Sequence, residues 1–181
     1  MVAPEQLSRV VSHALRHEPW VYELELDGEG WAPVDGLLTA VREQGPRWSD
    51  VDRDALVDMI ESSAKRRHEI DGDRIRALYG HSVPGQVLKI EAEPPERLFH
   101  GTSPEAWEAI QCDGLRPMAR QYVHLSADVS TAEQVGRRKA SAPVILVVQA
   151  RRAHEAGSRF WQGNDLVWLA DHVPAICLST D

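Results

Sequence analysis

The sequence has few of the features that define several common classes of protein. Cys112 and Cys177 are its only cysteines, too few for a disulfide framework or a cysteine-based zinc site. No apolar run approaches the roughly 18 residues of a membrane helix. The first residues also lack the basic start and the long apolar core of a secretory signal. We therefore expect a protein of the reducing cytoplasm that has no membrane partner.

Basic side chains are scarce as well. The net charge is −8, and residues 1–60 hold 5 basic and 12 acidic side chains, whereas residues 61–181 hold 15 and 16. A protein that coats nucleic acid through its overall charge is basic. Any binding of RNA by this chain must therefore depend on a few local arginines.

The glycine-rich loops of two common nucleotide sites are missing. There is no GxGxxG motif and no P-loop lysine, which excludes a Rossmann or a Walker site. No internal repeat or low-complexity tract is found. With 181 residues, 43% of them hydrophobic, the chain suits one large domain or two small lobes, and we expect a monomer.

Three helices are predicted in the first third of the chain. Apolar residues recur at the spacing of amphipathic helices in the stretches Leu7–Leu15, Leu37–Val41 and Leu56–Ile60. Pro19 ends the first helix, and Pro33 lies in the first turn of the second. Ser49 and Asp52 resemble a capping box ahead of the third, with Asp in place of Glu.

A hairpin follows these helices. Two short strands, residues 65–70 and 74–78, flank Asp71-Gly72-Asp73, which is a turn signal. Three helices followed by a hairpin is the winged-helix pattern. We therefore expect residues 1–81 to form a winged-helix lobe, followed by a proline-rich linker at residues 82–96.

The rest of the chain combines short strands with two or three helices. Ser103-Pro104 begins a helix and Gly114 ends it. The continuous apolar run at residues 144–148 predicts a strand buried on both faces. The expected strands lie at residues 87–90 within the linker and at 97–100, 121–125, 144–149, 166–169 and 175–178. We therefore expect an α+β fold in which residues 97–181 form a second lobe with a small, split β-sheet.

Several polar residues of the first lobe have two interpretations. Arg16 and His17 end the first helix, where cations stabilise the helix dipole. His13 and His17 are spaced as a zinc pair can be, but the helix lacks the Glu of an HExxH motif, and no metal is expected. The hairpin carries a basic cluster that is either a solvated wing or a phosphate site, since guanidinium groups match phosphate oxygens. The cluster consists of Lys65, Arg66, Arg67, Arg74 and Arg76, and alternation places Arg74 and Arg76 on one face.

The second lobe carries two polar strand ends. The segments 99–103 and 122–126 each contain a histidine, His100 and His124, followed by a hydroxyl residue. Gly101 allows a ligand to approach the backbone, and the helix that follows offers free N–H groups to an anion. A single histidine on a strand is usually a packing residue, but packing explains two strand-end histidines, each followed by a hydroxyl residue, less readily.

Taken together, these segments resemble the RNA 2′-phosphotransferase family in order and spacing. The resemblance extends from about Leu7 to Leu178. The matching strings are Leu15-Arg16-His17, Lys65-Arg66-Arg67, Arg74-Ile75-Arg76-Ala77, Gly80-His81-Ser82, Phe99-His100-Gly101-Thr102, Tyr122-Val123-His124-Leu125-Ser126-Ala127 and Val167-Trp168-Leu169. The resemblance implies an N-terminal winged-helix lobe that binds RNA phosphate and a C-terminal lobe related to ADP-ribosyltransferases that binds NAD⁺.

The resemblance also implies a reaction. In the family, an internal RNA 2′-phosphate attacks the nicotinamide-bearing ribose carbon of NAD⁺ and expels nicotinamide, which gives a 2′-phospho-ADP-ribosyl RNA. The neighbouring ribose hydroxyl then attacks the phosphate and releases 2′-hydroxyl RNA and ADP-ribose 1″,2″-cyclic phosphate. NAD⁺ is a co-substrate and no metal is required. In organisms that splice tRNA through a 2′-phosphate junction, spliced tRNA is the obvious RNA partner, but the family also occurs where no such pathway is apparent.

Site residues are implied position by position. The catalytic group is Arg16, His17, Arg67 and Arg120, and the cofactor-binding residues are His100, Gly101, Thr102, His124, Leu125 and Ser126. Fixed arginine donors stabilise charge on a phosphoryl group during transfer. His17 either donates to the phosphate or moves a proton.

Three positions depart from the family pattern. His68 replaces a usual aromatic, Tyr79 a usual glutamine, and Asp165-Leu166 a usual Asn-Gly, for which leucine cannot adopt glycine angles cheaply. None of these is a proposed catalytic residue, so we expect activity to be retained.

Two other functions remain open. One is a winged-helix regulator with a ligand-sensing lobe, which the acidic third helix at residues 49–63 disfavours, because duplex-binding helices are usually basic. The other is an ADP-ribosyltransferase that modifies nucleic-acid phosphate ends and stops after the first step.

Overall fold

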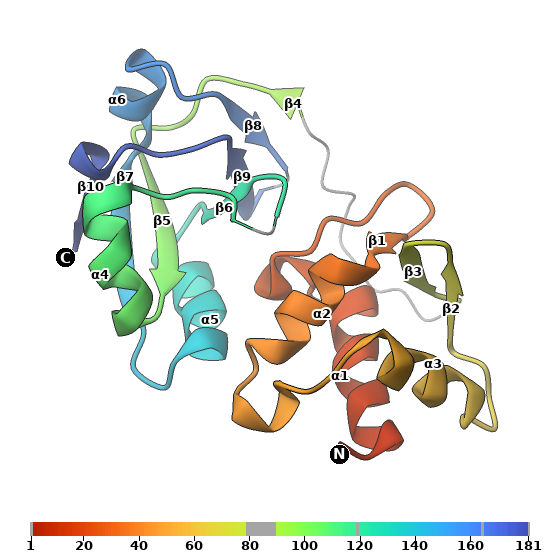
Figure 1. Cartoon of the computed structure of the whole chain (residues 1–181). Coiled ribbons are helices and arrows are strands. Elements are labelled where there is room, and N and C mark those ends of the chain that lie inside the picture. The colour runs from red at the N-terminus through yellow and green to blue at the C-terminus, as the bar shows by residue number, and fades with distance from the viewer. Residues whose placement is uncertain (1, 79–89, 119, 164, 181) are drawn as a thin grey trace. The chain divides into compact units, whose positions relative to one another are not determined.

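Helices and antiparallel strands make up both halves of the computed structural model, which describes residues 2–78, 90–118, 120–163 and 165–180. Within these ranges there are six α-helices and two antiparallel sheets, a mixed composition that agrees with the predicted α+β class. The chain divides into two units, Met1–Gln86 and Val87–Asp181 (Figure 1). The predicted strand at 87–90 and the departure at Tyr79 lie largely outside the described residues.

The three predicted helices of the first unit are confirmed. They are α1 (Pro4–Arg16), α2 (Val34–Arg42) and α3 (Arg53–Glu61), with short 3₁₀ helices η1 (Pro19–Tyr22) and η2 (Pro46–Trp48) between them. Leu7, Val11 and Leu15 of α1 are buried against Leu37 and Leu56, as their helical spacing predicts. The apolar stripe of each helix thus forms one core.

The cap of α3 differs from the prediction. Asp52 is the N-cap residue, and its carboxylate accepts a hydrogen bond from the Ala55 N–H at 2.9 Å. Ser49 instead ends η2 and donates to Asp50 at 3.1 Å. The prediction of Ser49 as the cap is therefore wrong, because η2 occupies the residues before it and α3 begins four residues later.

A small sheet completes the first unit. It contains β1 (Ala32–Pro33), β2 (His68–Asp71) and β3 (Arg74–Ala77) in the order β1-β3-β2. Gly72 has a φ of +55°, as a tight turn between β2 and β3 requires. The hairpin is confirmed, but β2 begins only at His68. Residues 65–67 therefore precede the strand and are exposed.

The second unit is built on one antiparallel sheet. Its strands are ordered β10-β7-β5-β6-β9-β8-β4. They are β4 (Ile90–Glu91), β5 (Arg97–Thr102), β6 (Val123–Ser126), β7 (Val144–Gln149), β8 (Phe160–Gln162), β9 (Val167–Ala170) and β10 (Leu178–Thr180). The prediction missed β8. It also placed a strand at residues 175–178, where a 3₁₀ helix, η3 (Ala175–Cys177), precedes β10.

Three helices accompany this sheet. They are α4 (Pro104–Asp113), α5 (Val129–Lys139) and α6 (Ala150–Glu155). The predicted limits of α4 are confirmed: the Ser103 hydroxyl accepts from the Ala106 N–H at 3.2 Å, and Gly114 ends the helix with a φ of +74°. Figure 1 shows α5 beside β5, and this packing is close enough to exclude a side chain at Gly101. A Cβ there would lie 2.0 Å from the Ala132 carbonyl oxygen.

Pairing within the large sheet is shortest between β5 and β6. Phe99 and Ser126 are the one pair joining these strands among the described residues, whereas β5 pairs with β7 along its whole length. The two strands therefore part beyond Phe99, next to His100. No helix within the described ranges is long and apolar enough to cross a membrane.

Candidate functional site

Arg16 and Arg67, which are far apart in the sequence, meet in the first unit. Arg16 is the last residue of α1, and its Nη2 donates to the Arg67 main-chain oxygen at 3.2 Å. The same oxygen accepts from the Leu78 N–H at 3.0 Å. The main chain at Arg67 is thus held by both α1 and the end of the hairpin, while the Arg67 side chain is exposed.

His17 follows Arg16 and is exposed at the C-terminal end of α1, where its N–H bonds to the His13 oxygen. His13 has partners at both ring nitrogens, with Tyr22 Oη 3.1 Å from Nδ1 and a Glu18 oxygen 3.4 Å from Nε2. The zinc-pair interpretation of His13 and His17 is therefore not supported. Across the described ranges, no group of three or more His, Cys, Asp or Glu residues could hold a metal ion.

His68, one of the departures from the family pattern, is buried immediately after Arg67. Its side chain is 2% exposed, and its Nε2 lies 3.1 Å from Ser12 Oγ on α1. Burial, and then the neighbouring charges of Arg16 and Arg67, lower the pKa of His68 to about 4. The imidazole is therefore neutral at physiological pH.

The arginines of β3 are paired within the hairpin and stack on a tryptophan. Arg74 and Arg76 lie on one face of the strand, as predicted, and their guanidinium carbons stand 4.9 and 4.4 Å from the centre of the Trp31 ring. Each is also paired with a carboxylate: Asp71 lies 3.2 Å from Arg74, and Glu69 lies 2.5 Å from Arg76. Each of these two guanidinium groups thus has a carboxylate partner within the wing. Lys65, Arg66, Arg67 and Arg74 are exposed, and only Arg76 of the cluster is partly buried.

In the second unit, the histidine pair lies where β5 and β6 part. His100 Nδ1 is 2.9 Å from the His124 carbonyl oxygen, and both side chains are buried. A carbonyl oxygen only accepts, so Nδ1 donates this bond, and in the neutral form of the ring Nε2 would be the acceptor. Ser126 pairs with Phe99 beside this contact.

The remaining residues that were predicted to bind a cofactor have different environments. Thr102 and Ser126 are buried hydroxyl residues at the ends of β5 and β6. Leu125 packs its side chain in the hydrophobic core, so a ligand would meet its main chain. Glycine is required at position 101 by the packing of α5, not only by the approach of a ligand.

Arg120 belongs to the second unit, in the segment between α4 and β6. Its N–H bonds to the Pro117 oxygen at 3.0 Å, and its side chain is partly exposed. The Asp165-Leu166 departure is accommodated without strain, because Leu166 is not among the described residues with positive φ. The Leu166 carbonyl accepts from the Ala127 N–H, which links this loop to the residue after β6.

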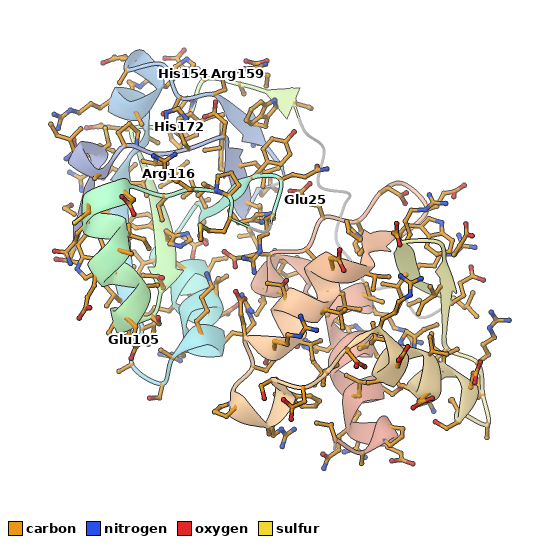
Figure 2. The ribbon with its side chains drawn as sticks, viewed as in Figure 1. Glu25, Glu105, Arg116, His154, Arg159 and His172 are labelled. Atoms are coloured by element: carbon orange, nitrogen blue, oxygen red, sulfur yellow. The ribbon has the colours of Figure 1, made fainter. Side chains whose placement is uncertain are left out.

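One group of residues resembles a hydrolytic triad that the sequence did not indicate. Ser158 Oγ lies 3.4 Å from His172 Nε2, and His172 Nδ1 lies 2.9 Å from Asp171 Oδ1. Ser158 is buried, and Asp171 Oδ1 also accepts from the Arg159 and His172 N–H groups, which tie the network to the main chain. Figure 2 shows His154, Arg159 and His172 at the end of the unit near α6. The network joins two loops and is structural.

Comparisons with known proteins agree with the resemblance. The family model described as "RNA 2′-phosphotransferase, Tpt1 / KptA family" matches residues 3–172. A protein of Bacillus thuringiensis subsp. konkukian is 53% identical over 93% of this chain and 91% of its own length. One from Acetivibrio thermocellus is 50% identical over 94% and 93%, and one from Rhizobium rhizogenes is 45% identical over 96% and 92%. Each of the three bears the name "Probable RNA 2′-phosphotransferase".

Proposed function

Because the chain belongs to the RNA 2′-phosphotransferase, Tpt1/KptA family, we propose that it is an enzyme that removes an internal 2′-phosphate from RNA, with NAD⁺ as the acceptor. The observation that carries this proposal is the bond from Arg16 to the Arg67 main chain. It places two permanently charged guanidinium residues together beside the exposed His17, on a lobe whose first 60 residues are strongly acidic.

The architecture supports the two lobes of this proposal. In the first unit, three helices followed by the β2–β3 hairpin have the order of a winged helix. In the second, the sheet that parts between β5 and β6 is consistent with a fold related to the ADP-ribosyltransferases. We propose that the first lobe binds the RNA phosphate and that the second binds NAD⁺.

In the first lobe, the phosphate ligands would be Arg16, His17 and Arg67. A guanidinium group offers a planar pair of donors that fits phosphate oxygens, and it stays charged at any pH the enzyme meets. His17 lies beside Arg16 and is exposed, so it is able to donate to the same phosphate or move a proton. As phosphoryl transfer proceeds, these fixed donors stabilise the charge on the oxygens.

In the second lobe, the donor and acceptor groups at the parting of β5 and β6 fit a dinucleotide. When bound, NAD⁺ would supply the electrophilic ribose carbon and the hydroxyl that receives the phosphate. With Nδ1 donating to the His124 carbonyl, Nε2 of a neutral His100 ring would accept from a ribose hydroxyl, and Thr102 and Ser126 add hydroxyl groups able to bond ribose or phosphate oxygens. His124 would complete this set, and Arg120 would stabilise the transferred phosphate.

The decisive experiment supplies both substrates. The purified protein is incubated with NAD⁺ and a short RNA bearing one internal 2′-phosphate, without added metal, and the products are identified by mass spectrometry. We expect 2′-hydroxyl RNA, nicotinamide and ADP-ribose cyclic phosphate. The same RNA with a 2′-hydroxyl is the control and stays unchanged. Intact RNA and intact NAD⁺ in the first reaction would refute the proposal.

The same assay separates the alternatives. A wild-type protein that accumulates RNA carrying ADP-ribose on its phosphate would be an ADP-ribosyltransferase that stops after one step. A regulator that binds duplex through α3 is disfavoured, because Arg53, the one basic residue in that helix, bonds to Asp73 and to the Gly72 carbonyl of the hairpin. A gel shift with random duplex DNA tests it, and we expect no shift.

A further inference from the structure

The side chain of His68 makes a second link between the two segments that hold Arg16 and Arg67. Ser12 and Arg16 are four residues apart on α1 and therefore lie on the same face of the helix. His68 and Arg67 are consecutive at the start of β2. Ser12 contacts His68 at 3.1 Å, and Arg16 contacts the Arg67 oxygen at 3.2 Å. Two polar contacts thus join α1 and the start of β2 side by side.

The His68 link is better protected from water than the arginine link. The His68 ring is 2% exposed, whereas the Arg16–Arg67 contact is exposed. A partly buried hydrogen bond to a packed ring holds its geometry more firmly than an exposed one. The Ser12–His68 contact is therefore the part that fixes the distance between the helix and the strand.

The environment also requires a neutral ring. Burial lowers the pKa of His68, and the positive charges of Arg16 on α1 and Arg67 in the preceding segment lower it further. A positive imidazole would be a third cation beside two guanidinium groups in a buried position, which is unfavourable. A neutral ring packs between the helix and the strand and forms one hydrogen bond. It adds no charge to that of Arg16 and Arg67.

We propose that His68 is a positioning residue that, through Ser12, sets the spacing of Arg16 and Arg67 for the 2′-phosphate of RNA. This inference rests on the proposed function for the identity of the ligand. It assigns His68, which replaces the usual aromatic residue, a role in phosphate recognition through its neighbours and not through direct contact.

Three variants test the proposal. His68→Phe keeps a buried ring and removes the bond to Ser12, His68→Gln keeps a polar group near the position of Nε2, and Ser12→Ala removes the partner. We expect His68→Phe and Ser12→Ala each to raise the KM for 2′-phosphorylated RNA by roughly tenfold, because small misplacements of binding groups are costly. The KM for NAD⁺ stays unchanged in these variants. In His68→Gln the KM for 2′-phosphorylated RNA stays close to the wild-type value. Ser8→Ala, which changes a buried serine one turn earlier on α1, is the matched control.

The double variant Ser12→Ala/His68→Phe distinguishes a shared link from two separate effects. If Ser12 and His68 act through one contact, the KM for 2′-phosphorylated RNA is no higher in the double variant than in either single variant. Additive losses, or equal losses toward RNA and NAD⁺ that follow a lower Tm, would overturn the proposal.

A measurement without substrate separates this inference from the proposed function. The Arg16 Nε–H resonance is followed by NMR in the wild type and in His68→Phe. A changed shift supports positioning even if the wild type proves inactive, in which case only the proposed function fails. An unchanged Arg16 resonance overturns the inference whatever the activity.

Discussion

At the scale of single residues, the arginines differ in what neutralises them. Arg74 and Arg76 stack on Trp31 and pair with carboxylates of the same hairpin, whereas Arg67 holds its main chain against Arg16 and exposes its side chain. Residue type and sequence position alone do not separate these roles. The groups that each guanidinium contacts in the folded protein distinguish them.

This difference predicts unequal effects of substitution. Arg67→Ala should lower kcat/KM for 2′-phosphorylated RNA about 100-fold or more, because it removes a charged donor to the transferred phosphate. Arg74→Ala, the matched control on the same hairpin, should lower it less than about threefold. Steady-state kinetics on both variants measures this, and equal losses would mean that the whole hairpin binds phosphate.

The buried imidazole of His68 predicts how stability depends on pH. Its pKa is about 4 in the folded protein and about 6.5 when unfolded, so the unfolded chain binds the proton first as the pH falls. The contribution of the neutral His68 ring to the free energy of unfolding is fully present above pH 6.5. It is lost as the pH falls from 6.5 to 4, which lowers the free energy of unfolding by about 3 kcal/mol. Urea unfolding of the wild type and of His68→Phe across this range should show a smaller acid loss in the variant. Parallel curves would contradict the assignment.

At the scale of helices and strands, boundaries follow from local chemistry, whereas packing distances do not. Asp52, not Ser49, caps α3, because the carboxylate reaches the Ala55 N–H. Glycine is required at position 101 because α5 crosses β5 there, with a Cβ position only 2.0 Å from a helix carbonyl.

The cap predicts a contrast between neighbouring polar residues. Asp52→Ala should lower the free energy of unfolding by about 1 kcal/mol, since an N–H of the first turn loses its partner. Ser49→Ala should change it by less than about 0.5 kcal/mol, because it is a surface substitution outside the helix. Urea denaturation of both variants provides the comparison, and the reverse order would restore Ser49 as the cap.

The packing of α5 on β5 predicts a severe effect at one glycine. Gly101→Ala should destabilise the protein by about 3 kcal/mol, because the methyl group meets main-chain atoms that cannot move independently. Gly72→Ala is the control: nothing lies within 4 Å of its Cβ position, and only the φ of +55° costs about 1 kcal/mol. Thermal unfolding distinguishes them. A mild effect at Gly101 would show that the helix is free to shift.

At the scale of the whole molecule, charge limits how RNA is bound. The protein carries a net charge of −8, and most of the excess lies in residues 1–60. Binding must therefore rely on a few arginines and on the chemistry of the 2′-phosphate, not on a broad electrostatic surface.

This limit predicts a weak dependence of RNA affinity on salt. With about three phosphate contacts to a single strand, log K against log salt concentration should have a slope of about −2. Fluorescence anisotropy with a labelled, 2′-phosphorylated RNA at several salt concentrations measures the slope. A slope steeper than about −5 would reveal a basic surface that the composition does not suggest.

The sequence by itself determined the features that depend on neighbouring residues. Pro19 marks the end of α1, Ser103 and Gly114 bound α4, and Gly72 makes the hairpin turn, since each acts through the local backbone. The family also follows from the order of short strings along the chain, because homologous chains keep that order. The strands that were missed or misplaced, β8 and β10, have only three residues each, which leaves little periodicity to detect.

Only the tertiary structure decided which polar residues form hydrogen bonds with each other. Arg16 meets the Arg67 main chain across 51 residues, Ser12 meets His68 across 56, and His100 meets the His124 carbonyl across 24. The need for glycine at position 101 and the stacking of Arg74 and Arg76 on Trp31 likewise arise between elements distant in the chain. A sequence pattern reports on neighbours, whereas burial and pairing at a site are set by residues that only folding brings within a few ångströms.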